Sequence, residues 1–146
     1  MSSRGNEKTL PVKHIMKIAG FILAAVLVTA CSKSITFPTS EVVPAAEAVL
    51  NVDKNKSDNY EVKLDIDNLA SPDRLTPSRR NYVVWLVTQK HGTINIGNLR
   101  VSKKNKASLE TVTPYKPIRV FITAEDTPKA VLPSTQVVLD SGKFKV

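Results

Sequence analysis

Polar and hydrophobic residues alternate along much of the chain after residue 45, which is the pattern of half-buried β-strands. Residues 60–67 show it most clearly, because apolar and charged positions take strict turns. Successive strand residues point to opposite faces of a sheet, so this segment predicts a strand with one face in a core. Residues 46–53 repeat the pattern less strictly. The apolar faces consist of Ala46, Ala48, Leu50 and Val52, and of Tyr60, Val62, Leu64 and Ile66.

Residues 82–87 read YVVWLV and are apolar on both faces, which predicts a central strand covered on both sides. Trp85 is predicted to fill the core between two sheets; stacking on a ligand is the alternative. Residues 94–101 follow a short turn, and their alternation changes phase at Gly97. This change predicts a bulge or tight turn.

Residues 68–80 form a long polar connection that contains two prolines. Leu69 and Leu75 are predicted to fold back onto the core, around a short helical turn begun by Ser71 and Pro72. Binding surfaces on sandwiches tend to lie in loops at one end. This loop is therefore the candidate binding surface, and its cationic residues are Arg74, Arg79 and Arg80.

Further short apolar segments occupy residues 107–112, 118–124, 137–139 and 144–146, separated by turn residues. About seven short strands with no long helical period predict an all-β fold, an antiparallel Ig-like β-sandwich. An up-and-down barrel is the alternative. The composition agrees: 42% hydrophobic and 23% charged residues in 146 are ordinary for one globular domain. A single cysteine excludes an internal disulfide.

The first 30 residues have the parts of a secretory signal peptide. A basic leader precedes an apolar run, residues 18–28, which is shorter than the roughly 20 residues of a membrane-spanning helix. Met16 would itself begin a typical signal, so residues 1–15 are either an extended leader or precede the true start. The run ends in Val28-Thr29-Ala30-Cys31.

This ending resembles the lipobox of bacterial lipoproteins. The resemblance implies cleavage before Cys31, a diacylglyceryl group on its thiol and an acyl group, such as palmitate, on its new amine. Ser32 follows without an aspartate retention signal, which favours the outer membrane in a two-membrane bacterium, on its periplasmic face or at the cell surface. Residues 31–44, rich in Ser, Thr and Pro, are predicted to be a flexible lipidated tether, followed by the sandwich domain at 45–146.

Charge and candidate chemistry argue against several classes of function. Removing residues 1–30 leaves 17 basic and 12 acidic residues, a mild excess of +5. Its densest cluster, at residues 103–106, is interpreted as a solvated turn with favourable contact to anionic lipid or surface polymer, and no nucleic acid is expected as a partner. His91 is the only histidine after Cys31, so neither a catalytic triad nor a zinc site is predicted. No metal or cofactor is expected.

Asp65 and Asp67 are the remaining catalytic candidates. They lie two residues apart on one strand face, about 7 Å from each other, as paired carboxylates of a hydrolase could. They also continue a row of charged residues, so a solvated outer face is the favoured interpretation. The chain is therefore not expected to be an enzyme.

The strand pairs resemble the extracytoplasmic domain of anti-sigma-K factors. The resemblance covers roughly residues 58–142 and rests on YVVWLV followed by Gly97-Asn98-Leu99, then on residues 122–125, Pro133 and residues 137–139. It implies a sandwich fold and an envelope-facing module. Sigma-factor binding does not carry over, because the family's sigma-binding domain, membrane-spanning helix and His-x-x-x-Cys-x-x-Cys motif have no counterpart in this sequence.

The sequence thus predicts a monomeric, membrane-anchored envelope lipoprotein whose sandwich binds an envelope protein or polymer without catalysis. One alternative is an accessory of envelope signalling that acts with a sigma/anti-sigma system. The other is an envelope hydrolase that uses Asp65 and Asp67.

Overall fold

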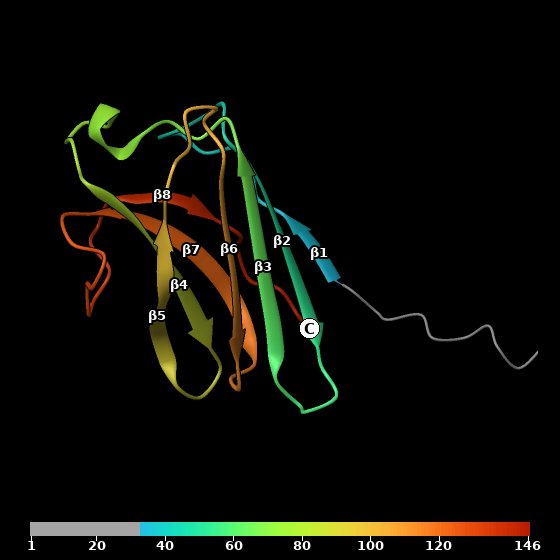
Figure 1. Cartoon of the computed structure of the whole chain (residues 1–146). Helices are drawn as coiled ribbons and strands as arrows, with labels where there is room; N and C mark the ends of the chain where they lie inside the picture. Colours follow the sequence, from blue (N-terminus) through green and yellow to red (C-terminus); the bar gives the residue numbers. More distant parts are fainter. Residues whose placement is uncertain (1–32) are drawn as a thin grey trace, which may run out of the picture. The chain divides into compact units, whose positions relative to one another are not determined.

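Residues 33–146 are described by the computed structural model, and they form two antiparallel four-stranded sheets that pack face to face (Figure 1). The sheets have the strand orders β1-β2-β3-β6 and β5-β4-β7-β8. The strands are β1 (Lys33–Thr36), β2 (Glu47–Lys54), β3 (Tyr60–Asp67), β4 (Asn81–Thr88), β5 (Gly92–Leu99), β6 (Ala107–Thr113), β7 (Pro117–Glu125) and β8 (Val137–Asp140). The predicted all-β sandwich is confirmed, with two separate sheets in place of a closed barrel.

The connections follow the Greek-key plan of Ig-like sandwiches. Strands β2 and β3 form one hairpin and β4 and β5 another, while the chain crosses between the sheets after β3, β5 and β6. Strand β6 returns beside β3, and β7 returns beside β4. Figure 1 shows the β3–β4 loop at one end of the sandwich and the β2–β3, β4–β5 and β6–β7 turns at the other.

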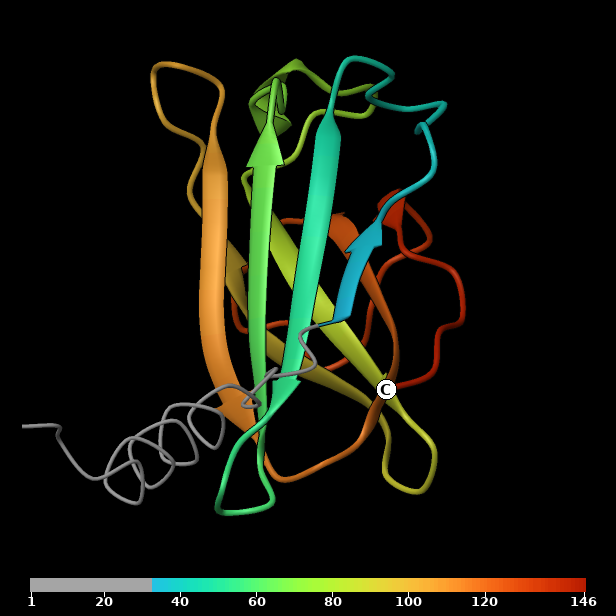
Figure 2. The same cartoon turned by 90° about the vertical axis from the view of Figure 1, so that its right-hand side faces the viewer.

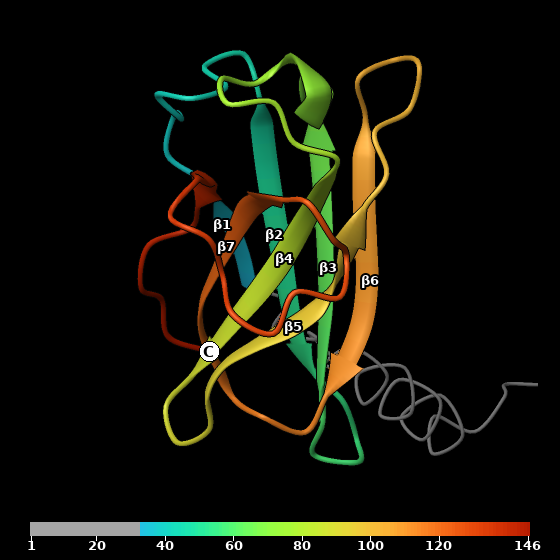
Figure 3. The same ribbon diagram turned by 90° about the vertical axis from the view of Figure 1, so that its left-hand side faces the viewer.

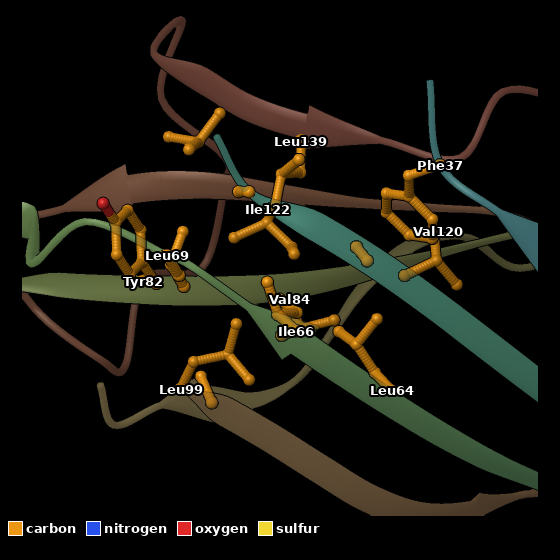
Figure 4. Close-up of a cluster of buried hydrophobic side chains, with 14 of the residues drawn as sticks. Phe37, Leu64, Ile66, Leu69, Tyr82, Val84, Leu99, Val120, Ile122 and Leu139 are labelled. Atoms are coloured by element: carbon orange, nitrogen blue, oxygen red, sulfur yellow. The ribbon is translucent and has the colours of Figure 1, made fainter. Parts of the chain in front are cut away.

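Alternate residues of the strands fill the space between the sheets (Figure 4). On β3, Val62, Leu64 and Ile66 are buried, whereas the charged residues between them are exposed, as the alternation predicts. Leu64 pairs with Leu50 of β2 and with Leu109 of β6, so the apolar side chains form rows across the sheet. Each fully buried side chain of this size contributes about 1.5–3 kcal/mol.

Strand β4 is buried on both faces, as predicted, but the position of Trp85 differs from the expectation. Tyr82, Val84 and Leu86 point into the main core, and residues of the opposite parity point to the outer face of the second sheet. There Trp85, which is 0% exposed, packs with Val83 and Phe121. The expectation that Trp85 lies between the two sheets is therefore wrong, because an odd offset from Tyr82 places it on the other face.

The loop between β7 and β8, residues 126–136, covers this outer cluster and crosses over β4 and β5 (Figure 3). Asn95 on β5 donates hydrogen bonds to the carbonyl oxygens of Pro128 and Ala130, at 3.2 and 3.0 Å. The indole Nε1 of Trp85 donates to Thr123 Oγ1 at 2.7 Å. The first sheet covers the inner face of the second sheet, whereas the β7–β8 loop covers the cluster on its outer face.

The segment predicted to be a flexible tether belongs to the sandwich from residue 33 onward. Strand β1 pairs with β2, where Lys33 is opposite Val52 and Thr36 is opposite Val49. Phe37 and Val43 are buried in the main core. Ser40 Oγ donates to the carbonyl of Val138 and so ties this segment to β8. The boundary expected at residue 45 is thus corrected, because polar composition hid two apolar anchors.

Two local predictions are confirmed. The register between β4 and β5 shifts between Val84 and Trp85, opposite Gly97 and Asn95, which places a bulge at the expected point. Gly97 has φ +144°, and a Cβ there would lie 2.9 Å from Leu109 Cδ1, so glycine fits this position best. A 3₁₀ turn occupies Pro72–Arg74, flanked by the buried Leu69 and Leu75.

Candidate functional site

The β3–β4 loop is held firmly against the end of the sandwich. Leu69 is fully buried, and its amide donates to the carbonyl of Asn105 at 2.8 Å. The hydroxyl of Tyr82 donates to the carbonyl of Ala70 at 2.8 Å, and burial raises the pKa of this phenol to about 12. The loop is thus a positioned surface, although most of its residues are polar.

Arg79 fixes this loop to the β7–β8 loop. Its Nε donates to Gln136 Oε1 at 2.9 Å, and its Nη1 donates to Asp126 Oδ2 at 2.8 Å. Gln136 Nε2 in turn donates to the carbonyl of Pro77 at 3.0 Å. Because two of its five N–H donors bind Gln136 and Asp126, we interpret Arg79 mainly as a residue that positions the two loops.

A cavity of about 520 Å³ lies between this loop and the end of β5. We call it the arginine cavity; it is lined by Ser71, Pro72, Asp73, Arg79, Arg80, Asn81, Asn98, Leu99, Arg100, Val101 and Pro128. Arg80 and Arg100 are exposed. Within the described residues, Arg74 is not part of the lining and is exposed on the 3₁₀ turn. The structure therefore brings together two of the three predicted arginines.

Arg100 is a lining residue that the sequence analysis missed. Its position could have been inferred from the register of the β4–β5 hairpin, in which Tyr82 pairs with Leu99. That register sets residue 100 beside residue 81, next to Arg80. The guanidinium group is planar and always charged, and its fork of donors suits carboxylate and phosphate groups. The arginine cavity can therefore hold an anionic group.

Asp65 and Asp67 line a neighbouring open cavity of about 750 Å³, which shares Asn98 and Arg100 with the arginine cavity. Both aspartates are about half exposed, at 52% and 53% of the side chain. Lys106 Nζ lies 2.6 Å from Asp67 Oδ1, and this hydrogen bond raises the pKa of Lys106. Asp65 and Asp67 thus lie on the exposed face of β3, and Asp67 is paired with a lysine. Side chains in this position could make polar contacts to a ligand bound at the surface.

Other predicted positions lie elsewhere. His91 lies in the β4–β5 turn, which is at the end of the sandwich opposite the β3–β4 loop (Figure 1), and its ring packs on that of Tyr115 with centroids 4.3 Å apart. Within residues 33–146, no group of three or more His, Cys, Asp or Glu side chains could hold a metal ion. In the same part of the chain, no helix is long and apolar enough to cross a membrane. Cys31 and the lipobox residues Val28, Thr29 and Ala30 lie outside the described residues.

Comparison of the chain with protein-family models, curated proteins and solved structures gives no match.

Proposed function

We propose that the protein is a lipoprotein of the cell envelope, anchored to a membrane through lipid on Cys31. We propose further that its sandwich is a non-catalytic module that binds an envelope protein or polymer. One observation carries the proposal: the only cysteine follows Val28-Thr29-Ala30 directly after an apolar run, and it stands two residues before β1. An acyl anchor at this place leaves the whole sandwich outside the bilayer.

We propose that one end of the sandwich faces the anchor and that the other end, with the arginine cavity, binds the partner. Lys33 pairs with Val52 near the end of β2, whereas Glu47 at the start of β2 pairs with Asp67, just before the β3–β4 loop. The chain therefore enters the domain away from the arginine cavity. The exposed Arg80 and Arg100 stay accessible to a partner, and their charge favours anionic groups on that partner.

The anchor is tested by replacing Cys31 with alanine in the full chain. In the expected lipoprotein pathway, the Cys31 thiol carries the diacylglyceryl group, and cleavage and acylation of the new amine follow. Loss of the thiol should therefore prevent all three steps, and with them the several acyl chains that stable anchoring requires. We expect lipid labelling and cleavage before residue 31 to be lost together, so that the variant keeps its N-terminal segment, while Ser32→Ala retains both the label and the cleavage. An unlabelled parent protein would refute the anchor.

The binding surface is tested by placing a photo-crosslinking residue at Arg80 and, as the matched control, at Lys63 on the exposed face of β3. We expect defined cross-linked products from position 80 in cells and none from position 63. The products should be lost when Arg100→Gln is added, because this change removes a neighbouring cation. Equal cross-linking from both positions would contradict the proposed surface.

A further inference from the structure

A second charged surface lies at the end of the sandwich that carries the β4–β5 and β6–β7 turns. Four exposed lysines line a cavity of about 700 Å³ together with Gln89 and three apolar residues. The lysines are Lys33, Lys116, Lys143 and Lys145, and the apolar residues are Ile118, Phe144 and Val146. We call this surface the basic end.

The fold assembles the basic end from segments far apart in the sequence. After β8 the chain runs beside the start of β7, where the amide of Phe144 donates to the carbonyl of Ile118 at 2.9 Å. Lys143 and Lys145 flank Phe144 and are exposed. Lys33 Nζ donates to the carbonyl of Lys145, which joins β1 to the C-terminal segment. Figures 1 and 2 both show the C-terminus close to the start of β1.

The charge of the basic end is not compensated locally. The ion pairs found between residues of the described part of the chain include none of the four lysines. Asp140, at the end of β8, is held by Arg119. Even with a carboxylate on Val146, four ammonium groups leave the patch a net charge of about +3. A surface of this kind attracts an extended array of anions.

The surroundings of the patch suit the boundary between water and lipid. Tyr115 precedes Lys116 and is 36% exposed, and tyrosine is common at membrane interfaces. Lys90 and His91 stand beside it in the β4–β5 turn. Phe144 and Ile118 add partly exposed apolar surface among the lysines. Lysine stems with apolar neighbours are typical of surfaces that rest on headgroups.

The short distance along the chain between Cys31 and Lys33 indicates that the basic end faces the membrane. Cys31 precedes Lys33 by two residues, and two residues span at most about 7 Å. An acylated Cys31 would hold Lys33 next to the headgroups, so this step rests on the proposed anchor. We propose that the basic end docks on anionic phospholipid headgroups of the membrane that holds Cys31. The arginine cavity, at the other end, then faces away from that membrane.

The test uses the protein purified from membranes and reconstituted in vesicles of phosphatidylcholine, with or without phosphatidylglycerol. A water-soluble amine reagent labels the lysines, and mass spectrometry measures the rate at each position. We expect labelling of Lys33 and Lys143 to fall roughly threefold or more on anionic vesicles, since each lysine near such a surface adds a factor of about five to binding. Labelling of Lys103 and Lys104, at the opposite end, should not change. Adding 0.5 M salt, where the Debye length is about 4 Å, should remove the protection.

Two matched variants localise the effect. The triple change Lys116→Gln, Lys143→Gln and Lys145→Gln should abolish the protection of Lys33, because it weakens docking by about 100-fold. The control, with Lys103, Lys104 and Lys129 changed to Gln, removes the same charge from exposed positions elsewhere and should keep the protection.

The outcomes separate this inference from the anchor. A lipidated protein whose lysines label equally on both kinds of vesicle overturns the docking and leaves the anchor in place. If the purified protein carries no lipid, the proposed anchor is refuted. The docking proposal is then tested separately, by whether the protein sediments with anionic vesicles; no sedimentation would overturn it. Binding to a soluble acidic polymer in preference to vesicles would also overturn it.

Discussion

Trp85 shows how the parity of one strand position determines which cluster a side chain joins. It shares β4 with Tyr82, yet it packs under the β7–β8 loop, with its indole nitrogen bonded to Thr123. Trp85→Ala should lower the free energy of unfolding by about 3–5 kcal/mol. Trp85→Phe keeps most of the apolar contact and should cost less, with about 1 kcal/mol from the lost hydrogen bond.

Urea unfolding followed by far-UV circular dichroism measures both changes without relying on tryptophan emission. Val112→Ala is the control, because Val112 is 57% exposed and should change stability by less than about 0.5 kcal/mol. A loss below about 1 kcal/mol for Trp85→Ala would mean that the β7–β8 loop does not shield the indole.

Tyr82 gives stability a dependence on alkaline pH. Its pKa is about 12 in the folded protein, mainly through burial, and 10.0 for the free side chain. The folded-state pKa is raised, so Tyr82 leaves stability unchanged below pH 10, where the phenol is neutral in both states. Between pH 10 and 12 the unfolded chain loses the proton more readily, and stability falls by about 2–3 kcal/mol. Unfolding measured across this range should show the fall, and Tyr82→Phe should remove that part of it.

At the scale of elements, regular alternation was enough to predict β3, and an apolar run was enough to predict β4. Strand β1 could not be recognised in this way. It has four residues, of which only Ile35 is half-buried, and it is defined by pairing with β2. Arg100 was missed for a related reason, because its place beside Arg80 depends on the register of a hairpin. The resemblance to anti-sigma-K domains stays a prediction.

The segment before β2 provides a test of the corrected domain boundary. Phe37 is 7% exposed and its amide donates to the carbonyl of Ala48 at 2.9 Å. Phe37→Ala in the full chain should therefore cost about 3–5 kcal/mol of unfolding free energy in a denaturant titration. Thr39→Ala, at an exposed neighbouring position, should be nearly neutral. A flexible tether would instead make the two substitutions equivalent.

At the scale of the whole sandwich, β4 joins two hydrophobic clusters. Its inner residues pack between the sheets, and its outer residues pack under the β7–β8 loop. The loop is also linked to the β3–β4 loop through Arg79 and Asp126. Opening one cluster without the other would leave one face of β4 in water, so we expect the sandwich to unfold as one cooperative unit.

This expectation can be measured because the chain has a single tryptophan. Emission from Trp85 reports on the outer cluster, whereas far-UV circular dichroism reports on both sheets. The two signals should give the same midpoint and the same slope in urea. Arg79→Gln removes the ion pair with Asp126. Because the Asp126 side chain is largely exposed, this loss should shift both midpoints together by only a small amount. If the tryptophan signal changed at lower urea than the dichroism, the β7–β8 loop would open as a separate unit, and the outer cluster would not contribute to the global stability.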